Sequence, residues 1–149
     1  MADELAARLR FALARLHRRL RAHDRDDLTP SQMLALGTLD QRGPLRMGDL
    51  AAVERVAAAT MTRVVAPLVE RGLVTKQPDP EDGRCWLVAL TPSAEGLIAE
   101  IRAARTAYLA ECLAALPEDD RARLAAALPA LERLAEAELE LDRRAAVPV

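Results

Sequence analysis

The change of pattern at Gly72 constrains the fold of this chain more than any other feature of its sequence. Up to Gly72 the residues carry the start and stop signals of short helices. Beyond it come two short runs rich in β-forming residues, LVTKQ at 73–77 and RCWLVAL at 84–90, with PDPEDG between them. Two such runs joined by a turn-rich loop predict a β-hairpin. The fold class is therefore predicted to be mainly α with one small β-hairpin.

The helices before the hairpin are marked by local signals. The sequence predicts them at about 30–39, 49–53 and 58–71. Thr29 can cap the first, and Pro30 suits its first turn because proline lacks the N–H that would stay unpaired there. QRGP at 41–44 predicts a turn. Gly72 follows the third helix, where the left-handed backbone of a C-terminal cap favours glycine.

Long amphipathic helices are predicted at both ends of the chain. Leucines spaced three or four residues apart form a stripe on the first helix: Leu5, Leu9, Leu13, Leu16 and Leu20. Thr91-Pro92 opens a helix to about 116, and Pro117 opens a last helix. Its stripe is Leu124, Leu128, Leu131, Leu134 and Leu139. A monomer of 149 residues would leave these stripes uncovered, so we expect the terminal helices to pack together in a two-fold homodimer.

Composition argues against several classes of protein. No run approaches the roughly 18 apolar residues that cross a bilayer, and MADELAARLR lacks the apolar segment of a signal peptide, so we expect a cytoplasmic protein with no membrane partner. Cys85 and Cys112 lack CxxC spacing, and His17 and His23 lie six residues apart, so neither a disulfide framework nor a metal site is predicted. We find no nucleophile paired with a base and no phosphate-binding loop, and therefore expect neither an enzyme nor a cofactor.

The order helix, turn, helix, hairpin is the winged helix-turn-helix arrangement. In it the later helix enters the major groove of DNA, and the hairpin loop reaches the flanking backbone or minor groove. Met61, Val64, Val65 and Leu68 share the side of helix 58–71 that would face the core. The residues predicted to contact DNA lie opposite: Ala59, Thr62 and Arg63, with Thr60 on the flank. Arginine can bond guanine through two N–H groups, and threonine offers a hydroxyl and a methyl group.

The predicted organisation is a single domain, 1–149, with two functional parts. The winged helix-turn-helix spans 28–91, and the helical dimerisation part comprises 1–25 and 92–146. The expected partner is double-stranded DNA. Its site should be pseudo-palindromic, with half-sites about 34 Å apart, because a two-fold dimer presents two identical helices to successive major grooves.

Three stretches of the sequence resemble the MarR family of bacterial transcriptional regulators. They are LTPSQMLALGTL, GDLAAVERVAAATMTRVVAPLVERGLV and PDPEDGRCWLVALT, and the resemblance covers essentially the whole chain. Its most specific motif is Asp-x-Arg in the wing, which falls on Asp82-Gly83-Arg84. The resemblance implies that Arg84 enters the minor groove, where A-T-rich DNA is narrow and strongly negative. It also implies that Asp82 orients the Arg84 guanidinium through a charge-assisted hydrogen bond.

The resemblance further implies a mode of regulation. A protein similar to this family is expected to be a DNA-binding repressor that a small ligand, often aromatic or phenolic, releases. The ligand would bind between the terminal helices and the winged part. It would change the distance between the two 58–71 helices of the dimer, the helices that enter the major groove. Some members of the family sense oxidation through a cysteine. YLAECLAAL places Cys112 on an apolar helix, which favours a buried structural thiol instead.

Two departures from the family pattern leave a second function open. Ala57, Ala58 and Ala59 stand where relatives usually have a polar cap and an arginine or similar residue. Between 54 and 91, five basic residues are balanced by five acidic ones. A non-basic DNA-binding region predicts weak non-specific affinity and a modest salt dependence. The alternative is a winged-helix protein-interaction module without DNA affinity.

Overall fold

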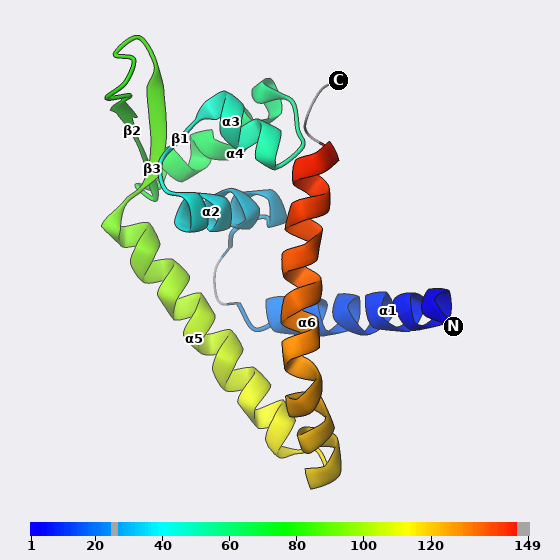
Figure 1. Ribbon diagram of the computed structural model, residues 1–149. Coiled ribbons are helices and arrows are strands. Elements are labelled where there is room, and N and C mark those ends of the chain that lie inside the picture. Colours follow the sequence, from blue (N-terminus) through cyan, green and yellow to red (C-terminus); the bar gives the residue numbers. More distant parts are fainter. Residues whose placement is uncertain (25–26, 146–149) are drawn as a thin grey trace. The chain divides into compact units, whose positions relative to one another are not determined.

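The computed structural model describes residues 1–24 and 27–145, and the side chains of 1–24 and 27–135. The chain forms two compact units, the first from Met1 to Thr106 and the second from Ala107 onward. Its helices are α1 (Ala2–Arg21), α2 (Pro30–Arg42), α3 (Met47–Val53), α4 (Ala58–Glu70), α5 (Pro92–Ala114) and α6 (Glu118–Ala145), and its strands are β1 (Leu45–Arg46), β2 (Val74–Pro78) and β3 (Trp86–Leu90) (Figure 1). The prediction of a mainly α chain with a small β-hairpin is confirmed.

Local capping fixes both ends of α2. The Thr29 hydroxyl accepts a hydrogen bond from the Gln32 N–H at 3.2 Å, and the Gln32 side-chain oxygen accepts one from the Thr29 N–H at 2.9 Å. This capping box pairs two N–H groups that the start of a helix leaves open. The helix runs to Arg42, beyond its predicted end, because its stop is Gly43 with a φ of 77°. Gly72 follows α4 at a φ of 69°, as predicted.

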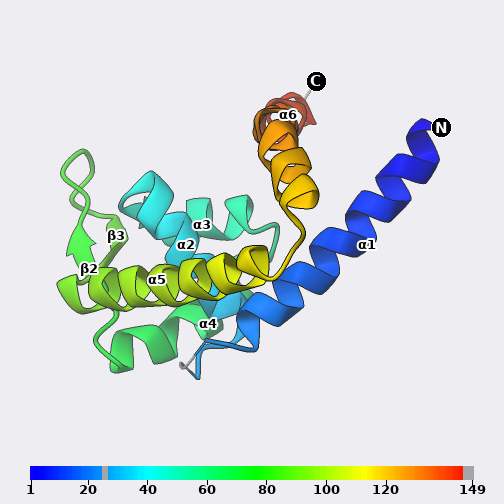
Figure 2. The same cartoon turned by 90° about the horizontal axis from the view of Figure 1, so that it is seen from below.

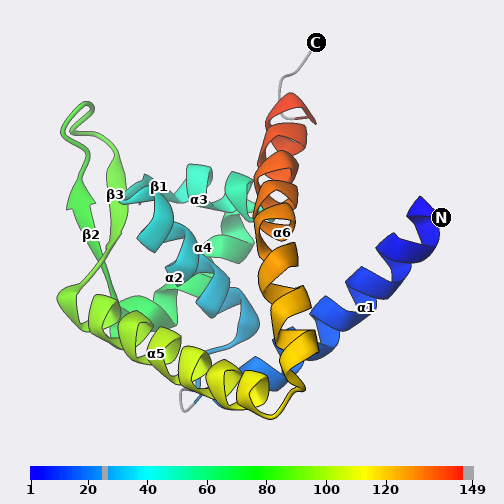
Figure 3. The same ribbon diagram turned by 60° about the horizontal axis from the view of Figure 1, so that its bottom comes forward.

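The hairpin belongs to a three-stranded antiparallel sheet with the order β1-β3-β2. Strand β1 is not predicted from the sequence; its Leu45 pairs with Val88 of β3, and Figure 3 shows β1 next to β3. Two residues show no alternation that could mark a strand, and β1 forms because β3 supplies a hydrogen-bonding edge. The strand leads directly into α3, which begins at Met47 and thus slightly before its predicted start.

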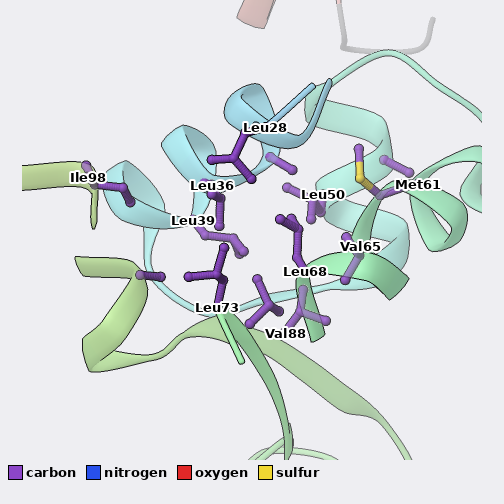
Figure 4. Packing of buried hydrophobic residues seen from close by; sticks show 14 residues of the cluster. Leu28, Leu36, Leu39, Leu50, Met61, Val65, Leu68, Leu73, Val88 and Ile98 are labelled. Carbon is purple, nitrogen blue, oxygen red and sulfur yellow. The ribbon is translucent and has the colours of Figure 1, made fainter. Parts of the chain in front are cut away.

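The core of the first unit holds α4 in place. Its largest fully buried side chains come from α2, α3, α4, β2 and β3: Leu36, Leu50, Leu68, Val65, Val74 and Val88. Figure 4 shows side chains of α2, α3, α4 and β3 pointing toward one another. Met61, Val65 and Leu68 are buried and Val64 packs against them, as their spacing predicts. Because this side of α4 is fixed in the core, its opposite side faces solvent.

Two ion pairs connect α5 to the rest of the first unit. Arg102 of α5 pairs with Asp40 of α2, which lies partly behind α5 in Figure 2. Arg105 binds Asp24 with two nitrogens, at 2.8 and 2.5 Å, one to each carboxylate oxygen. The Asp24 side chain is only 7% exposed. The hydrogen bonds from Arg105 lower the pKa of the Asp24 carboxyl below its ordinary value.

This pair should make the stability of the first unit depend on pH. A carboxyl whose pKa is lower in the folded chain stabilises the fold above its unfolded pKa of about 3.9, and this contribution is lost as pH falls through the folded pKa. The free energy of unfolding should therefore fall below about pH 5. Asp24→Asn should lower it by about 1–3 kcal/mol at neutral pH and flatten that pH dependence. Urea titrations check this against the exposed control Asp119→Asn; an unchanged pH profile in Asp24→Asn would contradict it.

Candidate nucleic-acid interface

The outer side of α4 carries the residues predicted to contact DNA. Ala59, Thr60, Thr62 and Arg63 are all exposed. Met61 and Val65, on the inner side, are 2% and 1% exposed. The structure therefore brings the four predicted residues together on one solvent-facing surface in the N-terminal half of the helix.

The polar groups on this surface differ in what they can still bind. Within the described part of the chain, neither the Thr60 hydroxyl nor the Arg63 guanidinium bonds to another side chain. The Thr62 hydroxyl donates to the Ala58 carbonyl at 3.0 Å, so its proton is occupied and its lone pairs remain as acceptors. Arg63 is thus the strongest donor on the surface, and Thr62 suits a base amino group better than a phosphate.

The start of α4 has no side-chain cap. Ala57 is its N-cap residue and makes no capping hydrogen bond, as the sequence predicts. In the turn before it, Arg55 adopts the left-handed conformation at a φ of 54°, the one residue other than glycine to do so in the described chain. A side chain with a Cβ is strained there by about 1–3 kcal/mol. The turn of the helix-turn-helix therefore stores strain.

Replacing Arg55 with glycine should release this strain. Arg55→Ala is the reference, because it removes the same side-chain interactions and keeps the strained Cβ; glycine has its own entropic cost of about 0.5–1 kcal/mol, so we expect Arg55→Gly to exceed Arg55→Ala by about 1 kcal/mol in the free energy of unfolding. Thermal denaturation should show a midpoint about 2–4 °C higher. The matched control is Ala66→Gly, at an exposed position inside α4, which should lower stability by about 0.5–1 kcal/mol. An Arg55→Gly protein no more stable than Arg55→Ala would argue against strain at Arg55.

An ion pair fixes the base of the wing, the loop between β2 and β3. Arg46 of β1 donates to one carboxylate oxygen of Asp79 from Nε at 2.8 Å and from Nη2 at 2.6 Å. The other oxygen accepts the Glu81 N–H at 2.9 Å. The Asp79 side chain is 6% exposed. The bond from Glu81 and then that from Arg46 lower the pKa of the Asp79 carboxyl. The charged Asp79 carboxylate therefore joins the wing loop to β1 through Arg46.

The tip of the wing presents Arg84 to solvent. The family resemblance implies that Asp82 orients the Arg84 guanidinium, but in the described chain no hydrogen bond joins the Asp82 carboxylate to that guanidinium. Oδ1 of Asp82 instead accepts the backbone N–H of Arg84 at 3.1 Å, a turn-forming bond. The guanidinium makes no bond within the part of the chain that the structure describes. Asp82 thus shapes the loop, and all the N–H donors of the Arg84 guanidinium remain available to a ligand.

Arg46 and Asp79 are not among the site residues predicted from the sequence. The two stand 33 positions apart, and only the pairing of β1 with β3 brings them together. One local signal could have marked Asp79: it precedes Pro80, and Asp-Pro favours a turn in which the carboxylate bonds a backbone N–H two residues on. That is the bond Asp79 makes with Glu81.

The described residues offer little for thiol or metal chemistry. Cys85 and Cys112 are free and half-buried. Burial, together with the neighbouring Asp82 carboxylate, raises the pKa of the Cys85 thiol, which disfavours the reactive thiolate. No three His, Cys, Asp or Glu side chains gather into a metal site within the described ranges. None of the described helices is long and apolar enough to cross a bilayer.

The leucines predicted to form a dimer interface lie on exposed stripes. Among the described residues, α1 buries no side chain, and α1 and α6 expose Leu5, Leu13, Leu16, Leu124, Leu128 and Leu134. Leu9 and Leu131 are half-buried, and the side chain of Leu139 lies outside the described residues. Each stripe thus leaves apolar surface open in the single chain.

The chain resembles known regulators over most of its length. The family model described as MarR family matches residues 28–86. The uncharacterized HTH-type transcriptional regulator Mb0904 of Mycobacterium bovis is 42% identical over 118 residues, which cover 78% of this chain and 82% of the relative. The chain belongs to the MarR family. It is therefore a DNA-binding transcriptional regulator, as the winged helix-turn-helix predicts.

Two further similarities agree with membership of the MarR family. The HTH-type transcriptional repressor MdtR of Bacillus subtilis is 24% identical over 140 residues, which cover 91% of this chain and 90% of MdtR. The crystal structure of transcriptional regulator Tm0710 from Thermotoga maritima matches with a TM-score of 0.79 at 25% identity, covering 93% of this chain and 98% of Tm0710. The winged-helix fold is confirmed, and these relatives are regulators rather than enzymes.

Proposed function

We propose that this MarR-family regulator is a homodimeric repressor that binds a pseudo-palindromic operator through α4 and the wing. A two-fold dimer would present its α4 helices to half-sites about 34 Å apart on one side of the duplex. The observation that carries the proposal is the pair Arg63 and Arg84. Both guanidiniums are exposed and bond to nothing in the described part of the chain, one on the outer side of α4 and the other at the wing tip.

The six predicted DNA-binding residues take different roles in this proposal. Arg63 and Thr62 read base edges in the major groove, and Thr60 contacts a phosphate. Ala59 gives its neighbours room and offers a methyl group for a thymine. Arg84 enters the minor groove, and Asp82 sets the backbone that presents it. Their support is the exposure of all six side chains on α4 and the wing.

The proposed dimer is supported by the open apolar stripes. Leu5 of α1 is 66% exposed, and Leu128 of α6 is 53% exposed. Apolar surface repeated along whole helices marks an interface more often than a solvated face. The first helix is rich in arginine and the last begins with Glu118, Asp119 and Asp120, so the two ends of paired subunits could also attract each other.

We further propose that the bound dimer represses transcription and that a small aromatic or phenolic ligand releases it. MdtR, a relative named as a repressor, supports the first part, and the family resemblance supports the second. Release requires the ligand to bind better to a dimer whose α4 spacing does not fit the operator. Phenolic acids added to the DNA complex should then dissociate it. The protein would act in the cytoplasm, where bacterial DNA lies, and would catalyse no reaction.

A binding titration tests the operator proposal. The purified protein is titrated into a fluorescent fragment of the DNA upstream of its own gene, at about 50 and 200 mM salt. A random duplex of equal length is the control. We expect binding by a dimer that weakens with salt and exceeds binding to the control. Failure to bind either duplex would favour the protein-interaction module instead.

A further inference from the structure

We propose that the Arg46–Asp79 ion pair positions the wing for DNA, which makes Asp79 a positioning residue for Arg84 although it touches no DNA itself. This inference rests on the proposed function, because it concerns how the wing presents Arg84. The Asp79 carboxylate is buried, with its side chain only 6% exposed. A buried carboxylate needs a charged partner, and Arg46 supplies it.

The ion pair joins the wing to the helices that carry the recognition surface. Arg46 is the last residue of β1 and the N-cap residue of α3. Asp79 is the first residue of the loop after β2. Since two nitrogens of Arg46 meet one oxygen of Asp79 at 2.8 and 2.6 Å, a shift of the loop relative to α3 would lengthen both bonds. Helix α3 packs on α4, so the pair ties the wing to the body that presents Arg63.

Asp79 also organises the loop around Arg84. Its second carboxylate oxygen accepts the Glu81 N–H at 2.9 Å. Its own N–H donates to the Cys85 carbonyl at 3.0 Å and closes the loop across its base. The Cys85 N–H in turn donates to the Asp82 carbonyl at 2.8 Å. The backbone on both sides of Arg84 is therefore held by bonds that lead back to Asp79.

The loop has few other sources of order. Pro80, Glu81, Asp82, Gly83 and Arg84 are all exposed, so no apolar core fixes them. A loop ordered before binding loses less conformational entropy when its tip enters the groove. The Arg46–Asp79 pair supplies this order at the base of the wing, where it does not compete with DNA for the guanidinium of Arg84.

The test uses the full-length protein and variants on both sides of the pair. Asp79→Asn removes the charge but keeps an oxygen that can accept the Glu81 N–H. Arg46→Met removes the partner, and Arg46→Lys keeps its charge. Glu81→Gln is the matched control, because it removes one charge from an exposed side chain of the same loop. Hydrogen exchange of the amides at 81–86 is measured without DNA, and operator affinity is measured with and without Arg84→Ala.

We expect Asp79→Asn and Arg46→Met to speed exchange in the loop and to weaken operator binding by about 3- to 30-fold. Added to Arg84→Ala, they should cause almost no further loss, because all three act through the same side chain. Arg46→Lys should regain part of the affinity, and Glu81→Gln should lose none. A residue that only supports folding would lower affinity equally whether or not Arg84 is present.

The outcomes separate this inference from the proposed function. If the wild type binds its operator and Asp79→Asn leaves both exchange and affinity unchanged, the inference fails alone. It also fails alone if the losses from Asp79→Asn and Arg84→Ala add in full. If the wild type binds no DNA, the proposed function fails and the inference falls with it.

Discussion

Replacing Arg84 with alanine should weaken operator binding by about 5- to 150-fold, or about 1–3 kcal/mol, without destabilising the fold. The Arg84 guanidinium is exposed and makes no bond within the described chain, so its removal leaves no internal group unpaired. In the proposed complex it lies in a narrow minor groove, where the negative potential is strongest. The loss should therefore be larger for an operator with A-T-rich flanks than for one with G-C-rich flanks.

Anisotropy titrations of a labelled operator measure this loss of affinity. Two further variants separate the effect of the charge from the effect of the guanidinium. Lys76→Ala is the matched control, since it removes an exposed positive charge from β2 of the same hairpin. Arg84→Lys keeps the charge but loses the planar guanidinium and should fall between the wild type and Arg84→Ala. Equal losses in Lys76→Ala and Arg84→Ala would mean that net charge, rather than insertion of Arg84, accounts for binding.

Ion pairs to residues outside the segment 54–91 leave the balance of charge in the DNA-binding region unchanged. Asp79 is neutralised by Arg46, and Arg71 is paired with Asp27 at 2.7 Å. The two arginines at the predicted contacts, Arg63 and Arg84, keep their donors free of described partners. Binding through a few placed cations agrees with a modest salt slope, so near-neutrality does not by itself favour the protein-interaction alternative.

The features predicted correctly from the sequence are those set by neighbouring residues. The Thr29 cap depends on Gln32, three positions away. The end of α4 two residues before Gly72 depends on the left-handed backbone of that glycine. The inner side of α4 follows from helical periodicity, because residues three or four apart share a face. Such features can be predicted from one sequence, because the residues that cause them lie within about four positions of one another.

The features that could not be predicted from the sequence depend on contacts between residues far apart along the chain. Strand β1 has two residues and exists through its pairing with β3. The bond between Arg46 and Asp79 spans 33 positions. Asp82 illustrates a further difficulty: a carboxylate two residues before an arginine can bond its backbone or its guanidinium, and the folded loop favours the backbone. The motif located the wing correctly, but the role of Asp82 required the geometry of the turn.

A charge placed in the α1 stripe should break the proposed dimer. Leu13 is 51% exposed in the single chain, so Leu13→Glu removes little packing within the subunit, and glutamate is a good helix former. In a dimer the same position would be buried, where an unpaired carboxylate is strongly unfavourable. The variant should therefore remain folded, with unchanged helix content by circular dichroism, and sediment as a monomer.

Loss of the dimer should also abolish high-affinity operator binding. A monomer engages one half-site at a time and loses the advantage of a linked second contact, so affinity should fall by roughly 10²- to 10⁴-fold. Ala7→Glu is the matched control, because it adds the same charge to an exposed position on the opposite side of α1; it should change neither sedimentation nor affinity. A monomeric Leu13→Glu that binds as tightly as the wild type would separate DNA binding from dimerisation. A Leu13→Glu protein that stays dimeric would place the interface away from this stripe.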